Sequence, residues 1–338
     1  MPSNQQILLD NRPTGEAAAS NFKLTTTDTP AISEGQVLVK HHFLSLDPYM
    51  RGRMSEAKGY TAPQALGQVM IGGTVGEVVE SRHAKFAVGD KVVGMGGWQQ
   101  FSVVDGDQVG ALRKVDTTHV PLSHYLGAVG MPGVTAYYGL VKIIEPKAGQ
   151  TVVVSAATGA VGSAFAALAK ARGCHVVGIA GGPEKCKYAQ DELGFDACID
   201  YKLHDSAGSL AKAIKAECPN GIDGYFENVG GMVLDAVLPL MNAFGRIALC
   251  GMIAGYDGKP MPLSYPALIL MSRLRIQGFI VSEHMEVWPE ALKELGMLVG
   301  SGKLKPRESV AQGIAAAPEA FLGLLKGKNF GKQVVKLI

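Results

Sequence analysis

Two glycines spaced three residues apart mark the segment of the sequence that is best suited to hold a ligand. Gly159 and Gly162 follow the apolar run 151–154 and precede a stretch of small residues. A strand that enters a helix through a glycine turn lets the backbone approach a pyrophosphate, because the free N–H groups of the helix start favour negative charge. Ala157 stands where the full dinucleotide fingerprint has its first glycine. The segment predicts a dinucleotide site, and the alternative interpretation is a glycine-rich packing turn.

The residues at the end of the next predicted strand indicate whether the cofactor is NAD or NADP. An acidic side chain about twenty residues beyond the glycine turn would bind the 2′-hydroxyl of the ribose. Gly181 and Gly182 stand there instead, and Lys185 follows, where an ammonium group would meet a 2′-phosphate. Glu184 places an opposing charge beside it, and the alternative for Lys185 is an exposed lysine at a helix start. The pattern favours NADP(H).

A catalytic zinc site would need about three Cys, His or carboxylate ligands. His41 and His42 are adjacent in a predicted strand, so their rings point to opposite faces and do not share one site. The cysteines all lie in the second half of the chain, without zinc-site spacing: Cys174, Cys186, Cys198, Cys218 and Cys250. We therefore predict no metal. Scattered thiols of odd number are typical of a reduced, cytoplasmic protein.

Composition excludes several classes of protein. The chain has 338 residues, of which 47% are hydrophobic and 18% charged, and its formal net charge is +2. A near-neutral chain has no strong electrostatic attraction to nucleic acid or to an anionic membrane. The 43 glycines follow no collagen-like period. There is no apolar run of 18 residues and no basic-then-apolar leader, so we expect neither a membrane span nor a secretory signal.

The predicted secondary structure around these residues changes near residue 125. Before it, short β-branched stretches bounded by glycine indicate a compact β-barrel. From residue 150, continuous apolar strands alternate with helices, which predicts an α/β domain with a doubly wound parallel sheet. Residues 234–241 are expected to be helical, and residues 275–281 to form an edge strand. A helix over 316–325 and a strand over 333–338 either extend this domain or return to the first.

Five motifs, in the same order along the chain, resemble the zinc-independent medium-chain dehydrogenase/reductases. They are residues 46–52 (LDPYMRG), 130–137 (GMPGVTAY), 156–162 (AATGAVG), 227–231 (ENVGG) and 326–332 (KGKNFGK). The likeness covers nearly the whole chain and is greatest to the prostaglandin/leukotriene reductase group, with its curcumin reductases and 2-alkenal double-bond reductases.

This resemblance implies a domain plan and an assembly. It implies a GroES-like substrate domain over residues 1–125 and a Rossmann NADP-binding domain over 126–300. It also implies that residues 301–338 return to the first domain, and that two chains form a homodimer through the Rossmann sheet. An apolar edge strand over 275–281 suits such pairing.

The resemblance also assigns cofactor contacts, position by position. The residues it implies are Gly159, Ala160, Val161 and Gly162 at the pyrophosphate, Lys185 and Tyr201 at the 2′-phosphate, Asn228, then Cys250, Gly251 and Tyr256 in a loop near the nicotinamide, Phe279, Ile280 and Val281 on a strand beside the cofactor, and Asn329. Some relatives carry a tyrosine where this chain has Ser282, so we expect no catalytic role there.

The implied reaction is reduction of the C=C bond of an α,β-unsaturated ketone or aldehyde. Hydride delivery to the β-carbon leaves negative charge on the carbonyl oxygen, which a hydrogen-bond donor stabilises. Tyr256 is the first candidate donor, because Gly255 and Gly258 flank it and allow close approach; Tyr60 and Tyr49 follow, and the cofactor's ribose hydroxyl is a fourth. The alternatives are a quinone reductase of the same superfamily and a non-catalytic NADPH-binding protein.

Overall fold

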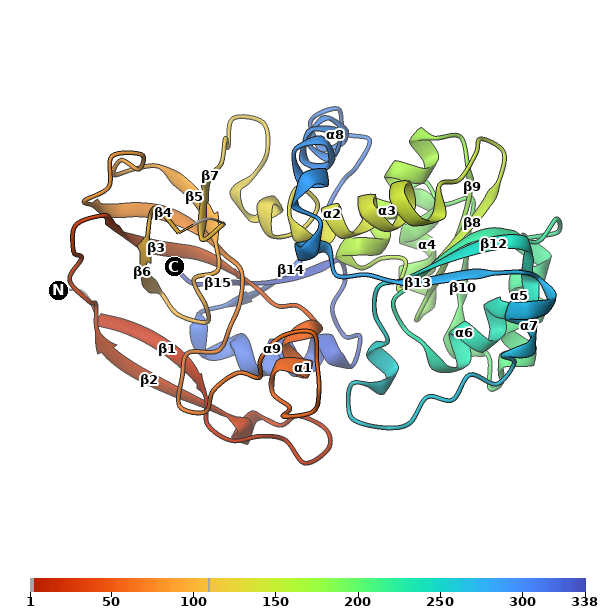
Figure 1. The fold of residues 1–338 in the computed structure, drawn as a ribbon, viewed down its shortest axis with the longest axis horizontal. Helices are drawn as coiled ribbons and strands as arrows, with labels where there is room; N and C mark the ends of the chain where they lie inside the picture. The colour runs from red at the N-terminus through yellow and green to blue at the C-terminus, as the bar shows by residue number, and fades with distance from the viewer. Residues whose placement is uncertain (1–2, 109) are drawn as a thin grey trace. The chain divides into compact units, whose positions relative to one another are not determined.

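The computed structural model describes residues 3–108 and 110–338, and the chain divides into two compact units. The first unit takes the chain up to Leu126 together with Glu308–Ile338, and the second takes Gly127–Arg307. The predicted fold class is confirmed, because one unit holds a mixed, mainly antiparallel sheet and the other a parallel sheet with helices (Figure 1). None of the described helices is long and apolar enough to cross a membrane.

The first unit is built on a seven-stranded sheet with an added hairpin. In the sheet, the late strand β15 lies between β14, to which it runs parallel, and β3, to which it runs antiparallel. The elements are β1 Ser3–Leu9, β2 Phe22–Asp28, β3 Gln36–Ser45, α1 Tyr49–Arg53, β4 Thr74–Ser81, β5 Lys91–Gly94, β6 Phe101–Asp105, β7 Leu112–Lys114, β14 Glu308–Gln312, α9 Ala317–Leu325 and β15 Lys332–Lys336. The N-terminal hairpin of β1 and β2 was not predicted.

Aromatic packing joins the two separate stretches of chain in this unit. Phe22 stacks on Trp98 with ring centroids 5.4 Å apart, and Phe321 of α9 meets Trp98 edge-on at 5.6 Å. Trp98 and Phe321 are fully buried. The C-terminal helix therefore completes a core that the first hundred residues begin.

The second unit holds six parallel strands in the order β10-β9-β8-β11-β12-β13, the order of a Rossmann sheet. Its elements are α2 Met131–Tyr138, β8 Thr151–Ser155, α3 Ala160–Ala171, β9 His175–Ala180, α4 Pro183–Asp191, β10 Ala197–Asp200, α5 Ala207–Glu217, β11 Ile222–Glu227, α6 Gly231–Val237, β12 Met241–Leu249, α7 Ala267–Met271, β13 Arg275–Gly278 and α8 Trp288–Gly300. β8 and the end of β9 are fully buried, as expected for strands covered on both faces.

Two predicted boundaries in this unit are wrong. The helix expected over 234–241 ends at Val237, because Pro239 lies in the following 3-10 turn and Met241 already pairs with β11. The strand expected through residue 281 ends at Gly278. Its ladder partner β12 stops at Leu249, opposite Gly278, so the residues beyond have no strand to pair with.

Phe279, Ile280 and Val281 therefore do not form the strand that the family resemblance implied. Val281 instead opens a 3-10 turn. Packing holds this stretch in place: the Phe279 ring lies 5.2 Å from the ring of Tyr138 and 6.1 Å from that of Phe226.

Candidate cofactor and active site

The carboxyl ends of the six parallel strands converge on one edge of the second unit. The strand order reverses between β8 and β11, and ligands of doubly wound sheets lie outside the strand ends at this point. The loops after β8, β9, β10, β11 and β12 all leave from this edge (Figure 1). They carry most of the residues that the sequence singled out.

The glycine turn after β8 is shaped by close backbone contacts. A Cβ on Gly162 would lie 2.5 Å from the carbonyl oxygen of Ala157 and 2.6 Å from that of Ala156, so only glycine fits there. Ala156 has a φ of 52°, which costs a residue with a side chain about 1 kcal/mol or more. Gly159 then caps α3 without offering a side chain to its first amides. This geometry suits a pyrophosphate at the helix start.

Ala157, which replaces a glycine of the fingerprint, has a packing role. It is fully buried, and its methyl group lies 2.8 Å from where a Cβ of Gly178 on β9 would stand. Because Gly178 has no side chain, it leaves space for the methyl group of Ala157. The departure from the fingerprint therefore does not disturb the turn.

A buried hydrogen-bond network joins the ends of β8 and β11. The hydroxyl of Ser155 donates to Oε1 of Glu227 at 2.7 Å, and the hydroxyl of Tyr225 donates to Oε2 at 2.8 Å. Two hydrogen bonds hold Asn228 to Ser155. The backbone N–H of Asn228 donates to the Ser155 hydroxyl and its Nδ2 donates to the Ser155 carbonyl, each at 2.8 Å. The network fixes Asn228 at the point where the strand order reverses.

Burial sets the electrostatics of this network. Burial raises the pKa of Glu227, although the N–H of Val229 and the two hydroxyls that donate to it act in the opposite direction. Burial, together with the nearby Glu227 charge, raises the pKa of Cys250 to about 12, so this thiol stays protonated at neutral pH. Glu227 is enclosed, and its role here is to position the neighbouring loop.

Tyr256 lies beside Asn228 in the same unit. Its hydroxyl is 3.4 Å from the position that a Cβ of Gly251 would occupy, and the carbonyl oxygen of Asn228 is 3.4 Å from that point as well. The loop is anchored, since the N–H of Ile253 donates to the Asn228 carbonyl at 3.2 Å and that of Ala254 to the Val229 carbonyl at 3.0 Å. A phenol donor is thus held at the ends of β11 and β12.

Lys185 follows the end of β9, and Tyr201 follows the end of the neighbouring strand β10. Lys185 is in the first turn of α4, and Tyr201 opens the 3-10 turn after β10. A Cβ on Gly181 would lie 2.9 Å from the Tyr201 ring, which shows how closely the ring covers that turn. Burial lowers the pKa of Lys185, and the charge of Lys202 lowers it further.

Tyr49, Tyr60 and Asn329 lie in the first unit. Tyr49 begins α1, and burial raises its pKa, with further contributions from the charges of Asp47 and Tyr60. Tyr60 is 55% exposed. Asn329 lies between α9 and β15, where its Nδ2 donates to the Gly331 carbonyl at 2.7 Å.

The histidines do not gather into a site. His41 is buried and its Nε2 lies 2.8 Å from the Ser102 hydroxyl, while His42 is half-buried. Across residues 3–108 and 110–338, no three His, Cys, Asp or Glu side chains are grouped so that they could hold a metal ion.

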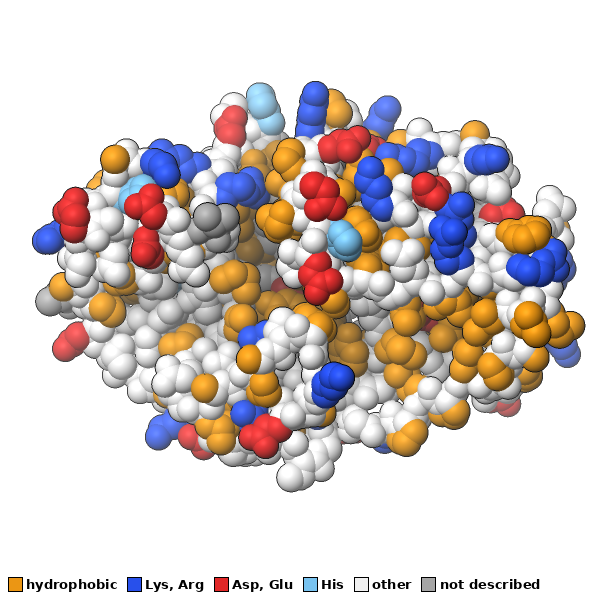
Figure 2. Space-filling view, viewed as in Figure 1, with side chains coloured by type: hydrophobic (Ala, Val, Ile, Leu, Met, Phe, Trp, Pro, Cys, Tyr) orange, Lys and Arg blue, Asp and Glu red, His pale blue; other side chains and the backbone are white. Residues whose placement is uncertain are grey.

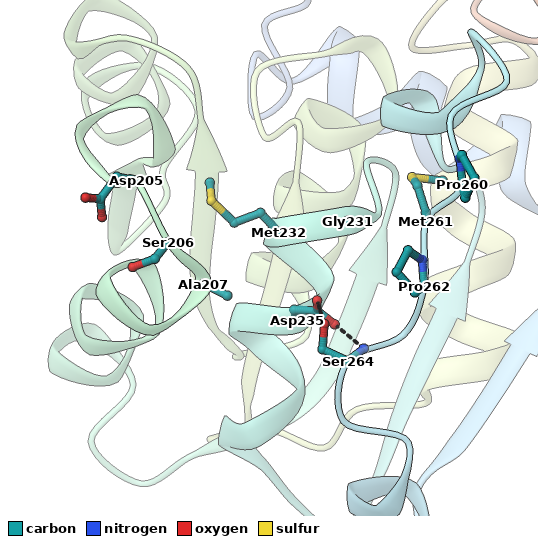
Figure 3. A pocket seen from close by; sticks show the side chains of 10 residues that line it. All are labelled: Asp205, Ser206, Ala207, Gly231, Met232, Asp235, Pro260, Met261, Pro262 and Ser264. Atoms are coloured by element: carbon teal, nitrogen blue, oxygen red, sulfur yellow. Dashed lines mark hydrogen bonds between the residues drawn. The ribbon is translucent and has the colours of Figure 1, made fainter.

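A hollow of about 430 Å³ opens beside the starts of α5 and α6 (Figure 3). It is lined by Asp205, Ser206, Ala207, Gly231, Met232, Asp235, Pro260, Met261, Pro262 and Ser264. The N–H of Ser264 donates to Asp235 at 3.1 Å and closes one side. Only Gly231 belongs to a motif seen in the sequence, so nothing in the residue spacing indicated this hollow.

Comparison with known proteins identifies the family. Residues 5–112 match the N-terminal domain of oxidoreductase, and residues 160–296 match the zinc-binding dehydrogenase model. The NADPH-dependent curcumin reductase of Escherichia coli is 46% identical, covering 99% of this chain and 97% of its own. The chain belongs to the medium-chain dehydrogenase/reductases. The predicted resemblance is thereby confirmed.

Other members of this medium-chain group match over the same length. The NADP(+)-dependent 2-alkenal reductase of Nicotiana tabacum is 42% identical, with 98% of this chain and 97% of that protein covered. The crystal structure of CurA from Vibrio vulnificus in complex with NADPH is 46% identical, with a TM-score of 0.92 and 99% of each chain covered. These likenesses extend through both units of the dehydrogenase/reductase fold.

Proposed function

We propose that this protein reduces the C=C bond of α,β-unsaturated ketones and aldehydes with NADPH. The observation that carries the proposal is the full-length similarity, at 46% identity, to an NADPH-dependent curcumin reductase. The strand-end site supports it, because a tight glycine turn precedes α3 at Gly162 and the Tyr256 hydroxyl lies in the loop after β12. Activity without zinc remains our prediction.

Each part of the site has a task in this reaction. The turn over Gly159, Ala160, Val161 and Gly162 would hold the pyrophosphate, and Lys185 with Tyr201 the 2′-phosphate. Cys250, Gly251 and the stretch 279–281 would line the nicotinamide end, and Asn228 and Asn329 are the remaining cofactor contacts that the family resemblance implies. Bound NADPH supplies the hydride.

Tyr256 would act on the substrate itself. Its hydroxyl donates a hydrogen bond to the carbonyl oxygen, on which negative charge grows as the β-carbon accepts hydride. The fixed position of the loop matters, because a donor already in place need not reorganise as the charge develops. Tyr60 and Tyr49 are the alternative donors, and solvent can supply the proton to the α-carbon.

Isotope labelling tests the proposed reaction. With NADPH deuterated at the transferred position and a simple enone, the label should appear at the β-carbon. In heavy water, deuterium should appear at the α-carbon. An allylic alcohol labelled at the former carbonyl carbon would contradict double-bond reduction. Turnover of quinones alone would favour quinone reductase activity, and NADPH binding without oxidation by any acceptor would indicate a non-catalytic protein.

We also propose a homodimer formed through the β13 edge of the Rossmann sheet. Hydrophobic side chains gather over this end of the second unit (Figure 2). Leu270, Met271 and Phe244 are 80%, 66% and 69% exposed, and β13 has a neighbour on one side only. Such a face favours pairing with a second copy. The cytoplasm remains the proposed compartment, from the scattered cysteines.

A further inference from the structure

We infer that Lys202 is a second determinant of selectivity for the 2′-phosphate of NADPH, acting together with Lys185 and Tyr201. The inference rests on the proposed cofactor, and it adds a residue that neither the motif spacing nor the family likeness singled out. Lys202 is an exposed residue in the 3-10 turn Tyr201–Leu203 that follows β10.

The side chain of Lys202 reaches back over the glycine turn after β9. Its Cε lies 3.0 Å from the position that a Cβ of Gly181 would occupy, and Tyr201 contacts the same position from 2.9 Å. The two side chains therefore cover one turn together. Since that turn leads directly into α4, both lie at the end of the helix where a phosphate would be bound.

Asp200 ties the backbone of Lys202 to this turn. Its Oδ1 accepts hydrogen bonds from the N–H of Gly182 at 2.8 Å and from the N–H of Lys202 at 3.0 Å. Gly182 is the N-cap of α4, a helix of nine residues. A single carboxylate oxygen thus joins the turn that carries Lys202 to the N-cap of the helix that carries Lys185.

Two cationic side chains stand on neighbouring elements here, Lys185 in the first turn of α4 and Lys202 in the turn after β10. The charge of Lys202 acts on Lys185, whose pKa it lowers after the larger effect of burial. Like charges held close together repel each other, and a ligand that brings two negative charges relieves that repulsion. Asp200 and Glu184 are the acidic groups nearby; the Asp200 oxygen is engaged by the backbone, and Glu184 is exposed.

This chemistry discriminates between the two nicotinamide cofactors. A 2′-phosphate carries close to two negative charges and three acceptor oxygens, which two ammonium groups and a phenol can satisfy. A 2′-hydroxyl offers no charge, so Lys202 gains little from NADH. Loss of Lys202 should therefore affect ligands with the 2′-phosphate selectively.

Calorimetric titration of the full-length protein tests this inference with ADP-ribose 2′-phosphate and ADP-ribose as probes. Lys202→Ala and Lys202→Gln should weaken binding of the phosphorylated probe about tenfold, and change binding of ADP-ribose by less than about twofold. Lys202→Arg should retain most of the affinity, because the charge is kept. The matched control is Lys187→Ala on α4, whose ammonium pairs with Asp191 at 2.5 Å and should change neither titration.

The outcomes separate this inference from the proposed function. If wild-type protein binds both probes equally, the NADPH preference itself is wrong, and this inference falls with it. If the wild type prefers the phosphorylated probe but Lys202→Ala binds both probes like wild type, or loses affinity for both equally, the role of Lys202 is overturned while the cofactor assignment stands.

Discussion

At the scale of single residues, the placement of the Tyr256 hydroxyl beside Asn228 and Gly251 makes a kinetic prediction. Tyr256→Phe should lower kcat about 100-fold, because the lost hydrogen bond strengthens only as charge develops on the carbonyl oxygen. The affinity for NADPH should change little. Stopped-flow reduction of an enone gives kcat, and fluorescence titration gives the affinity for NADPH.

Tyr60→Phe and Tyr49→Phe are the matched comparisons for this experiment. Both remove one phenol hydroxyl and leave the ring in place. If the loss of kcat follows one of these variants and Tyr256→Phe keeps full activity, the donor belongs to the first unit. If none of the three lowers kcat, a ribose hydroxyl is left as the donor.

The sequence predicted those parts of the site whose residues are close together along the chain. The glycine turn, Lys185 and the motif at 227–231 were visible, because each is a local pattern. The partnership of Ser155 with Glu227 spans 72 positions, and no periodicity connects them. Lys202 was missed for a related reason: its position over Gly181 depends on two parallel strands lying side by side.

At the scale of elements, a buried ion pair joins β15 to the turn that begins α1. The Nζ of Lys332 lies 2.6 Å from the Asp47 carboxylate and donates to the Leu46 carbonyl at 2.9 Å, and both side chains are less than 10% exposed. Removing Lys332 leaves the buried Asp47 carboxylate without its ammonium partner, although the Ser45 hydroxyl still donates to it, and losing one partner of a buried pair costs about 3–5 kcal/mol. Lys332→Met should therefore destabilise the first unit by about that amount.

Urea unfolding followed by Trp98 fluorescence, in a Trp288→Phe background, measures this loss in the first unit. Lys336→Met changes an exposed lysine on the same strand and serves as the control. The double variant Asp47→Leu/Lys332→Met should recover part of the stability, because no lone charge is buried. Equal stability of Lys332→Met and the control would show that the pair contributes nothing.

His41 on β3 predicts sensitivity to acid. Burial lowers its pKa from 6.5 to about 3, with a smaller effect of His42. Between these values the unfolded chain binds a proton that the folded chain does not, so stability falls as pH falls, by up to about 1.4 kcal/mol per pH unit. His41→Gln should flatten this slope in urea unfolding between pH 7 and pH 4.5.

The exposed His119 supplies the control for the acid experiment. His119→Gln should lose stability with falling pH as steeply as the wild type does. A His41→Gln protein whose stability follows the same slope as wild type would contradict the predicted proton linkage, whatever its stability at neutral pH.

The prediction of helices and strands from the sequence failed for other reasons than the prediction of site residues. Continuous apolar runs identified β8 and β9 without ambiguity. The stretch 279–281 is as apolar as a strand, yet it is not one, because strand length here is set by where β12 ends. In the hairpin, β1 has polar residues over its first four positions, and β2 is largely exposed and carries Lys, Thr and Asp residues, so its sequence has little apolar alternation to detect.

At the scale of the whole molecule, the exposed β13 face predicts a particle of two 35.5 kDa chains. Sedimentation velocity at micromolar concentration should show the dimer, and Leu270→Glu on α7 should shift it toward monomer by burying a charge at the interface. Met297→Glu places the same change at an exposed position of α8 and should leave the dimer intact. A wild-type monomer would reject the proposed assembly.

The position of β15 between β14 and β3 has a consequence for synthesis. The ribosome makes the strands of the first unit early, but β15 follows only after the entire second unit has been made. Until then β3 has an open edge along Phe43–Ser45, the residues that β15 will cover. The second unit is continuous in the chain and can fold as it emerges. The nascent protein therefore carries a finished Rossmann unit beside an unfinished, aggregation-prone sheet, which is the form that chaperones would meet.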